Sequence, residues 1–276
     1  MSSRVQLRCT VRGCGEALAR QGAPWICAKG HSFDQHRSGF LNLLQPQDRR
    51  SKTPGDSREA AQARRRLAEL GQAEVVHRAL AQVISSRSQG KAAPLLDVGC
   101  GEGAFLRHVA SVAGLERHGV DISAPSIELA AKASPDSLFI VANADRLLPY
   151  ADQAFDFVTA IDSRLNADEF KRVLRKGGLV LVAVPGPDDL IELRERVQGA
   201  KVEKSRATRI EEELGKMLTL VEQTSVRDQR TFDPPALRDL LTATYRGFRQ
   251  SEQAAVESLE AMTVTLSHEV LAFERR

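Results

Sequence analysis

Long hydrophobic segments are missing from this chain of 276 residues. No apolar run approaches the length of about 20 residues that a helix needs to span a bilayer. The N-terminus also lacks the apolar core of a secretory signal, so we expect neither a signal peptide nor a membrane segment. Only four cysteines are present, and in such a chain they are more readily explained as metal ligands or buried thiols than as disulfides. The sequence therefore predicts a cytoplasmic protein.

Charge is nearly balanced over the whole chain, with a net charge of +3, but it is unevenly distributed. Residues 1–66 contain 13 Lys and Arg against 5 Asp and Glu, whereas the remainder contains 26 against 31. A basic N-terminal part favours contact with a polyanion such as nucleic acid. A solvated basic helix would give the same imbalance, so charge alone leaves both explanations open.

Three of the four cysteines lie in the first 27 residues, next to a histidine. Cys9 and Cys14 form one pair, and Cys27 and His31 form a second pair with a spacing of three residues. Two such turns can bring four ligands into the tetrahedron that Zn²⁺ prefers. Because the protein fills all four positions, the site is expected to be structural. The alternative is three ordinary thiols and a surface histidine, and His36 is a spare ligand nearby.

The chain divides into three parts by composition. Residues 1–44 are turn-rich and have little core of their own, so a metal would stabilise them. Residues 45–90 are expected to form a basic linker, which begins with the polar segment QPQDRRSKTPGDS at 45–57, and two helices. Asp56 and Glu59 are expected to cap the first helix as a capping box. Residues 91–276 form the third part.

From residue 93 onward, buried strands alternate with helices. Strands are expected at PLLDV, RHGVD, LFIVA, FDFVTAID and LVLVAVP. This alternation predicts an α/β fold with a doubly wound parallel sheet and helices on both faces. Residues 187–216 are predicted to form a charged helical segment after the fifth strand. Residues 219–232 and 262–275 are expected to close the sheet as an antiparallel hairpin.

A glycine-rich turn, LDVGCGEG, follows the first of these strands. Gly99 and Gly101 let the backbone approach a ligand closely where a helix begins. Asp121, at the end of the second strand, can accept both hydroxyls of a ribose. Asp97 is interpreted as a residue that orders the glycine loop, with a catalytic role as the alternative. Cys100 is interpreted as a small residue that fits the turn.

Further along, ANADRLLPYADQAFD and RVLRKGG follow in order. Together with the glycine loop, these segments resemble the class I S-adenosylmethionine-dependent methyltransferases over about residues 70–185. The resemblance implies that S-adenosylmethionine is a cofactor and that the fold is Rossmann-like. The residues that it implies around the cofactor are Asp97, Gly99, Gly101, Asp121, Ile122, Asn143, Ala144 and Asp162, with the glycines beside methionine, Asp121 on the ribose, and Asn143 and Ala144 beside adenine. Another kind of nucleotide-binding Rossmann domain is the alternative.

The zinc motif, HSFDQHRSGFLNLL, RRSKTPGDSREAAQARRRL and PGPDDLIEL resemble segments of a more specific family. They are similar to the bacterial 23S ribosomal RNA (guanine-N1)-methyltransferases, which include macrolide-resistance members. The resemblance implies methylation of a guanine N1 in large-subunit ribosomal RNA. It also implies a structural Zn²⁺ held by Cys9, Cys14, Cys27 and His31, an RNA-recognition role for residues 1–44, a methyltransferase domain over residues 91–276, and a homodimer as an option.

The chain departs from the family pattern at several places. Its first zinc pair has a spacing of four residues instead of two. The segment after the fourth strand reads AIDSRLNADEF, where the family has an aromatic or apolar residue followed by Ala-Pro. Asp189 replaces a histidine, Ala73 replaces a tyrosine, and a late Met-Thr-Pro-aromatic segment reads ATYRG, with Tyr245. Either the substrate has changed, or transfer is weak or lost in an RNA-binding paralogue. A small-molecule methyltransferase is a third alternative, but it leaves the surplus of basic residues in residues 1–66 unexplained.

Attack by a guanine N1 requires that its proton be removed. Asp162 is the nearest carboxylate to the end of the fourth strand and is a weak candidate for this base. A helix cap or a loop hydrogen bond explains it equally well. The aromatic residues available to stack on a flipped base are Trp25, Tyr245 and Phe248, and Trp25 is better explained as core. No catalytic residue is assigned from the sequence.

Overall fold

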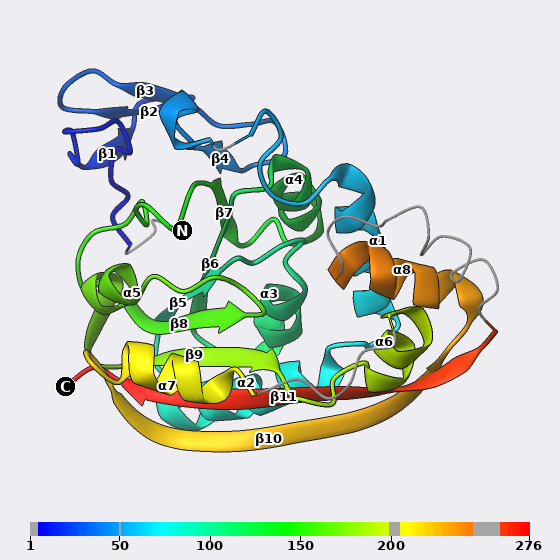
Figure 1. Cartoon of the computed structure of the whole chain (residues 1–276). Coiled ribbons are helices and arrows are strands. Elements are labelled where there is room, and N and C mark those ends of the chain that lie inside the picture. Colours follow the sequence, from blue (N-terminus) through cyan, green and yellow to red (C-terminus); the bar gives the residue numbers. More distant parts are fainter. Residues whose placement is uncertain (1–4, 50, 199–204, 245–259) are drawn as a thin grey trace.

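The computed structural model describes residues 5–49, 51–198, 205–244 and 260–276 (Figure 1). The strands are β1 (Leu18–Arg20), β2 (Pro24–Cys27), β3 (Ser32–Asp34), β4 (Leu41–Asn42), β5 (Ala93–Val98), β6 (Leu115–Asp121), β7 (Leu138–Val141), β8 (Phe155–Ile161), β9 (Leu174–Pro185), β10 (Thr219–Phe232) and β11 (Met262–Glu274). The helices are α1 (Arg58–Glu69), α2 (Glu74–Ser88), α3 (Ala104–His108), α4 (Ala124–Ala133), α5 (Ala167–Val173), α6 (Ile191–Gln198), α7 (Ala207–Leu214) and α8 (Pro234–Thr244), with short 3₁₀ helices η1 (Pro46–Asp48) and η2 (Val109–Ser111).

The central sheet has eight strands in the order β10-β11-β9-β8-β5-β6-β7-β4. The six strands from β9 to β4 pair in parallel. Helices connect β5 to β6, β6 to β7 and β8 to β9, whereas a loop without a helix connects β7 to β8. The two long strands β10 and β11 close the other edge as an antiparallel pair. The predicted doubly wound α/β fold with a closing hairpin is therefore confirmed.

Helices cover both faces of this sheet (Figure 1). On one face, α2, α3 and α4 contribute apolar residues such as Leu80, Phe105 and Ile127 to a buried cluster. On the other face, α5 and α7 pack with Phe170 and Ile210. A third cluster joins α1, α6 and α8 to the last residue of β10 and the first part of β11. These three helices gather on the side toward which the arrowheads of β8 and β9 point.

The cysteine-bearing N-terminal part shares the core of the sheet. Leu7, Leu18 and Phe33 belong to the same buried cluster as α5 and α7. Its last strand, β4, pairs in parallel with β7, with Leu41 opposite Ile140. A two-residue strand carries no periodicity, so this pairing has no signature in the sequence. The division at residue 44 remains a prediction, but the strand just before it belongs to the large sheet.

The first helix begins one residue later than the sequence predicts. Ser57, and not Asp56, is the N-cap of α1, and its side chain accepts a hydrogen bond from the Ala60 N–H. Asp56 instead pairs with Arg64 at 2.8 Å. Serine and aspartate cap helices about equally well. Because the Asp56 carboxylate is taken up by Arg64, Ser57 serves as the cap. Helix α8 ends at Thr244, and the aromatic residues Tyr245 and Phe248 lie outside the described residues.

Candidate functional site

The structure brings together the four residues of the predicted metal site. Their ligand atoms all lie within 4.8 Å of one another. His31 Nδ1 lies 3.5 Å from Cys9 Sγ and 3.4 Å from Cys27 Sγ, and Cys14 Sγ lies 3.8 Å from Cys27 Sγ. Tetrahedral Zn²⁺ separates such atoms by about 3.5 to 3.8 Å. The donor set and its spacing therefore fit a structural Zn²⁺.

Local turns hold these ligands in place. Gly13 and Gly15 adopt positive φ angles of 72° and 67°, which close the longer first turn at no steric cost. In the second turn, Cys27 N–H donates to the His31 carbonyl at 3.1 Å. Burial opposes a Cys27 thiolate, but hydrogen bonds from the His31 and Lys29 backbone outweigh it and lower the pKa of Cys27 to about 7. The spare candidate His36 instead stacks on Phe40 with a centroid distance of 4.4 Å.

The glycine loop and Asp121 meet at the carboxyl ends of β5 and β6. The Gly101 N–H donates to Asp121 Oδ2 at 2.9 Å, and the Ser123 N–H donates to Oδ1 at 2.7 Å. Burial raises the pKa of Asp121, and these two hydrogen bonds oppose the shift. The position fits a carboxylate that accepts ribose hydroxyls, because ligands of open α/β sheets bind at this edge. Ile122 follows directly and is partly buried.

Asp97 has a different partner from the one that the sequence suggests. It is buried at the end of β5 and accepts a hydrogen bond from the Thr159 hydroxyl at 2.7 Å. Burial raises its pKa to about 7. No hydrogen bond from Asp97 to the glycine loop is found among the described residues. Cys100 is buried, and burial raises the pKa of its thiol well above the usual range, which is unsuited to a nucleophile.

A polar cluster lies at the carboxyl end of β8. Asp162 is exposed, has a positive φ of 50°, and its Oδ2 lies 3.1 Å from Nε2 of buried His268 on β11. Burial lowers the pKa of His268, but the charge and hydrogen bond of Asp162 outweigh it, so the pKa is raised. Asp189 accepts a hydrogen bond from the Ser267 N–H at 2.9 Å, and burial raises its pKa to about 6.

One further departure from the family pattern, Ala73, borders this cluster. Ala73 is the N-cap of α2, and the His77 N–H donates to its carbonyl at 2.9 Å. Burial, followed by repulsion from His108 and His268, lowers the pKa of His77 to about 3. His268 is thus the centre of the cluster. The charges of Asp162 and Asp189 favour its protonated form, and its own charge contributes to lowering the pKa of His77. His268 was missed in the sequence, because a histidine inside a strand pattern gives no sign of its distant partner.

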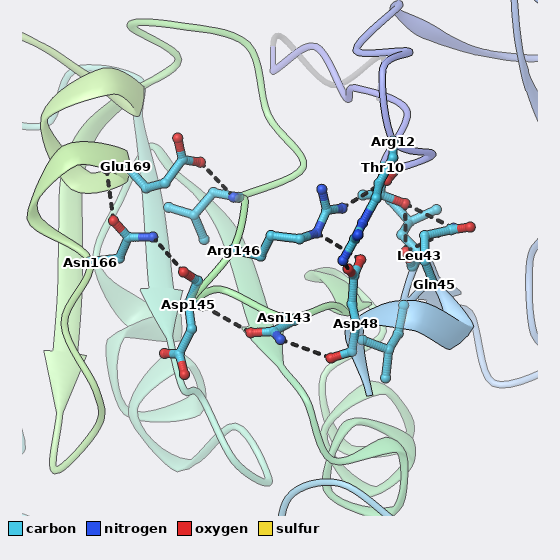
Figure 2. A network of polar contacts seen from close by, with 12 residues as sticks. Thr10, Arg12, Leu43, Gln45, Asp48, Asn143, Asp145, Arg146, Asn166 and Glu169 are labelled. Atoms are coloured by element: carbon cyan, nitrogen blue, oxygen red, sulfur yellow. Dashed lines mark hydrogen bonds and ion pairs between the residues drawn. The ribbon is translucent and has the colours of Figure 1, made fainter. Parts of the chain in front are cut away.

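The residues expected beside adenine lie in the loop after β7. Asn143 Nδ2 donates to the Asp48 carbonyl at 2.9 Å, and Ala144 accepts from Asn166 Nδ2 at 3.0 Å (Figure 2). Both residues are partly buried at the same edge as Asp121. The hydrogen bond from Asn143 to Asp48 was also missed, because the polar composition of residues 45–57 predicts a linker and gives no sign of a tertiary contact.

Comparison with known proteins gives matches in both parts of the chain. Residues 96–182 match the family model described as "Methyltransferase domain", and residues 7–52 match the zinc-ribbon model described as "RlmA, N-terminal". A chain from the "Complex between the Haloferax volcanii Trm112 methyltransferase activator and the putative methyltransferase" superimposes with a TM-score of 0.52. That match is 17% identical and covers 80% of this chain and 99% of the other, which supports the fold alone. Among the described helices, none has the length and apolarity of a membrane span.

Curated relatives are more similar in sequence. The "Putative 23S rRNA (guanine-N(1)-)-methyltransferase YxjB" of Bacillus subtilis is 36% identical, and the match covers 64% of each chain. The "23S rRNA (guanine(748)-N(1))-methyltransferase" of Streptomyces fradiae is 31% identical, and the match covers 84% of this chain and 81% of the relative. The chain therefore belongs to the family of zinc-ribbon, S-adenosylmethionine-dependent methyltransferases that includes these proteins.

Proposed function

We propose that the protein methylates N1 of a guanine in 23S ribosomal RNA. The observation that carries this proposal is the union of a Cys₃His module with a methyltransferase sheet in one shared core. Relatives that are 36% and 31% identical to this chain carry names that state this reaction. The surplus of basic residues in the first 66 positions suits an RNA partner.

The cofactor supplies an electrophilic methyl group on a sulfonium. The N1–methyl bond forms while the bond from sulfur to methyl breaks, and the proton on N1 must leave. We propose that Asp162 accepts this proton, because it is an exposed carboxylate at the carboxyl end of β8. His268 orients Asp162 through the contact of 3.1 Å, and the burial of the His268 side chain fixes that orientation.

The departures from the family pattern favour an active enzyme with a changed substrate pocket over a protein that has lost methyl transfer. Asp162 and Asp189 belong to segments that differ from the family, yet both act on the same buried histidine. Random loss of function would not be expected to bring compensating charges together around one residue. The small-molecule alternative is tested by the RNA experiment below.

Transfer of label from radioactive S-adenosylmethionine to unmodified 23S ribosomal RNA tests the proposal. Reverse transcription of the product locates the base, because a methyl group on N1 blocks pairing and stops the polymerase. We expect one stop at a guanine. A protein that binds S-adenosylhomocysteine but leaves every RNA unlabelled would support the non-catalytic paralogue instead.

The RNA surface needs variants that do not disturb the fold. Arg64 and Arg65 are unsuitable, because Arg64 pairs with Asp56 and Arg65 lies 3.6 Å from Glu102 of the glycine loop. Arg20 and Arg37 are exposed and line a groove on the zinc module. If they contact phosphates, each alanine substitution should reduce the salt dependence of RNA binding by about one unit of slope. A small-molecule enzyme would keep its activity in both variants.

A cytoplasmic location and a homodimer complete the proposal. The location follows from a ribosomal RNA substrate, and the homodimer follows only from the family resemblance. Light scattering on the purified protein tests the dimer, which predicts a mass of twice 30.2 kDa.

A further inference from the structure

Asp48 is a buried carboxylate between the zinc module and the catalytic domain. Its side chain is 2% exposed and lies in η1, just after the zinc module. Two guanidinium groups neutralise it, with Arg12 Nη2 at 3.2 Å and Arg146 Nε at 2.7 Å (Figure 2). A carboxylate removed from water needs such partners, and loss of one partner leaves an uncompensated charge. Asp48 therefore fixes the positions of two segments that are far apart in the sequence.

Those two segments carry the zinc ligands and the proposed adenine loop. Arg12 lies between the ligands Cys9 and Cys14. Arg146 lies in the loop after β7, and its Nη2 donates to the Thr10 carbonyl at 2.7 Å, one residue from Cys9. The same loop is held a second time, because Asn143 Nδ2 donates to the Asp48 carbonyl at 2.9 Å. The side chain and the backbone of Asp48 thus both hold one loop.

The loop is also anchored on its other side. Asn166 Nδ2 donates to the carbonyls of Ala144 at 3.0 Å and Asp145 at 3.2 Å. Glu169 Oε2 accepts a hydrogen bond from the Leu148 N–H at 2.6 Å. Figure 2 shows these contacts in a continuous series from Thr10 to the start of α5. Residues 143–148 are therefore placed jointly by the zinc module and by the segment after β8.

We propose that Asp48 is a positioning residue that couples the folded zinc module to the affinity of the cofactor site. The proposal rests on the proposed place of adenine beside Asn143 and Ala144. Without the Asp48 carboxylate, Arg146 loses the ion pair that orients the loop. Asn143 keeps its acceptor, the Asp48 backbone carbonyl, but Arg12 and Arg146 no longer hold that backbone in place. Because coupling between two sites is reciprocal, loss of zinc weakens cofactor binding, and cofactor binding favours the zinc-loaded module.

Calorimetry with S-adenosylhomocysteine on the full zinc-loaded chain tests this inference. Asp48→Ala should weaken binding about tenfold, within the usual range of coupling between sites. The matched control is Asp152→Ala. Asp152 also carries an ion pair to the zinc module, with Arg8 at 3.4 Å, and a second one to Arg172 at 3.0 Å. Its side chain is 55% exposed, and among the described residues no hydrogen bond or ion pair joins it to residues 143–146. The control should bind as the wild type does, and metal analysis should find zinc in both variants.

Removal of zinc with a chelator provides the second readout. We expect about tenfold weaker binding in the wild type but little further loss in Asp48→Ala, because the connection is already broken. Equal losses from chelation in both proteins, or equal affinities for Asp48→Ala and Asp152→Ala, would overturn the inference. If Asp48→Ala does not fold, Asp48→Asn and Arg146→Lys replace it. A wild type that does not bind S-adenosylhomocysteine would contradict the proposed function itself.

Discussion

Asp162 and His268 are 106 positions apart in the chain, and their side chains meet with Nε2 3.1 Å from Oδ2. The contact joins the carboxyl end of β8 to the antiparallel strand β11, across β9. His268 is 4% exposed, so a buried imidazole holds the exposed carboxylate of Asp162. A carboxylate oriented in this way can receive a proton at a fixed position without moving.

The first prediction concerns this pair in catalysis. Asp162→Asn should reduce kcat about 100-fold, because the amide cannot accept the N1 proton. The affinity for S-adenosylhomocysteine should change little. Asp168→Asn, at an exposed position in the first turn of α5, is the matched control and should keep its kcat. An unchanged kcat in Asp162→Asn would remove Asp162 from the mechanism.

His268 adds a pH dependence to the same measurement. Its pKa is raised by Asp162 although burial opposes the shift, so below that pKa an imidazolium holds the carboxylate and weakens it as a base. Activity should rise as the pH increases through this pKa. His268→Gln should lose that rise and keep a lower, flatter profile. Asp189, whose pKa burial raises to about 6, remains in the variant, so a rise that persists would be assigned to Asp189. His77, whose pKa burial lowers to about 3, does not titrate in this range.

A second prediction uses the buried Asp97. Its pKa is raised to about 7 in the folded chain, against 3.8 for the ordinary group. The folded state therefore binds this proton more tightly, and the stabilisation is complete below pH 3.8 and is lost as the pH rises through about 7. Between pH 5 and 8, the wild type should lose about 2 kcal/mol relative to Asp97→Asn. Denaturant unfolding of both proteins at the two pH values measures this difference, and parallel curves would contradict the burial effect.

The sequence predicted most of the fold because its signals are local. Strand β5 is buried at every position, and the glycine loop follows it directly, so both could be recognised from short segments. The zinc ligands also lie on two short turns. By contrast, the contacts of His268 with Asp162 and of Asp48 with Arg146 join distant segments. Only tertiary packing creates such pairs, and neither has a characteristic spacing.

The third prediction concerns the glycine loop. Gly99 has a φ of 73°, and a Cβ at this position would lie 2.5 Å from Cβ of Ser163. Gly177 has a φ of 75° but open space around it, so it is a matched control for backbone strain alone. Gly177→Ala should cost about 1 kcal/mol of folding free energy, and Gly99→Ala about 2 to 4 kcal/mol, because it adds a clash. Equal losses in thermal unfolding would show that Ser163 can move aside.

The fourth prediction separates the zinc ligands from their neighbour. Cys14→Ser should lose bound zinc, because a serine hydroxyl is a poor substitute for a thiolate in a closed site. His36→Ala should retain zinc, because His36 stacks on Phe40 and its Nδ1 accepts a hydrogen bond from the Ser38 N–H at 3.2 Å. Metal analysis of both purified variants measures this. Cys14→Ser should also lower the unfolding temperature of the whole chain. The reason is that Cys9 and Cys27 belong to the same buried cluster as Leu96 and Val158 of the central sheet. A Cys14→Ser protein that unfolds at the wild-type temperature would show that the shared core does not depend on the metal.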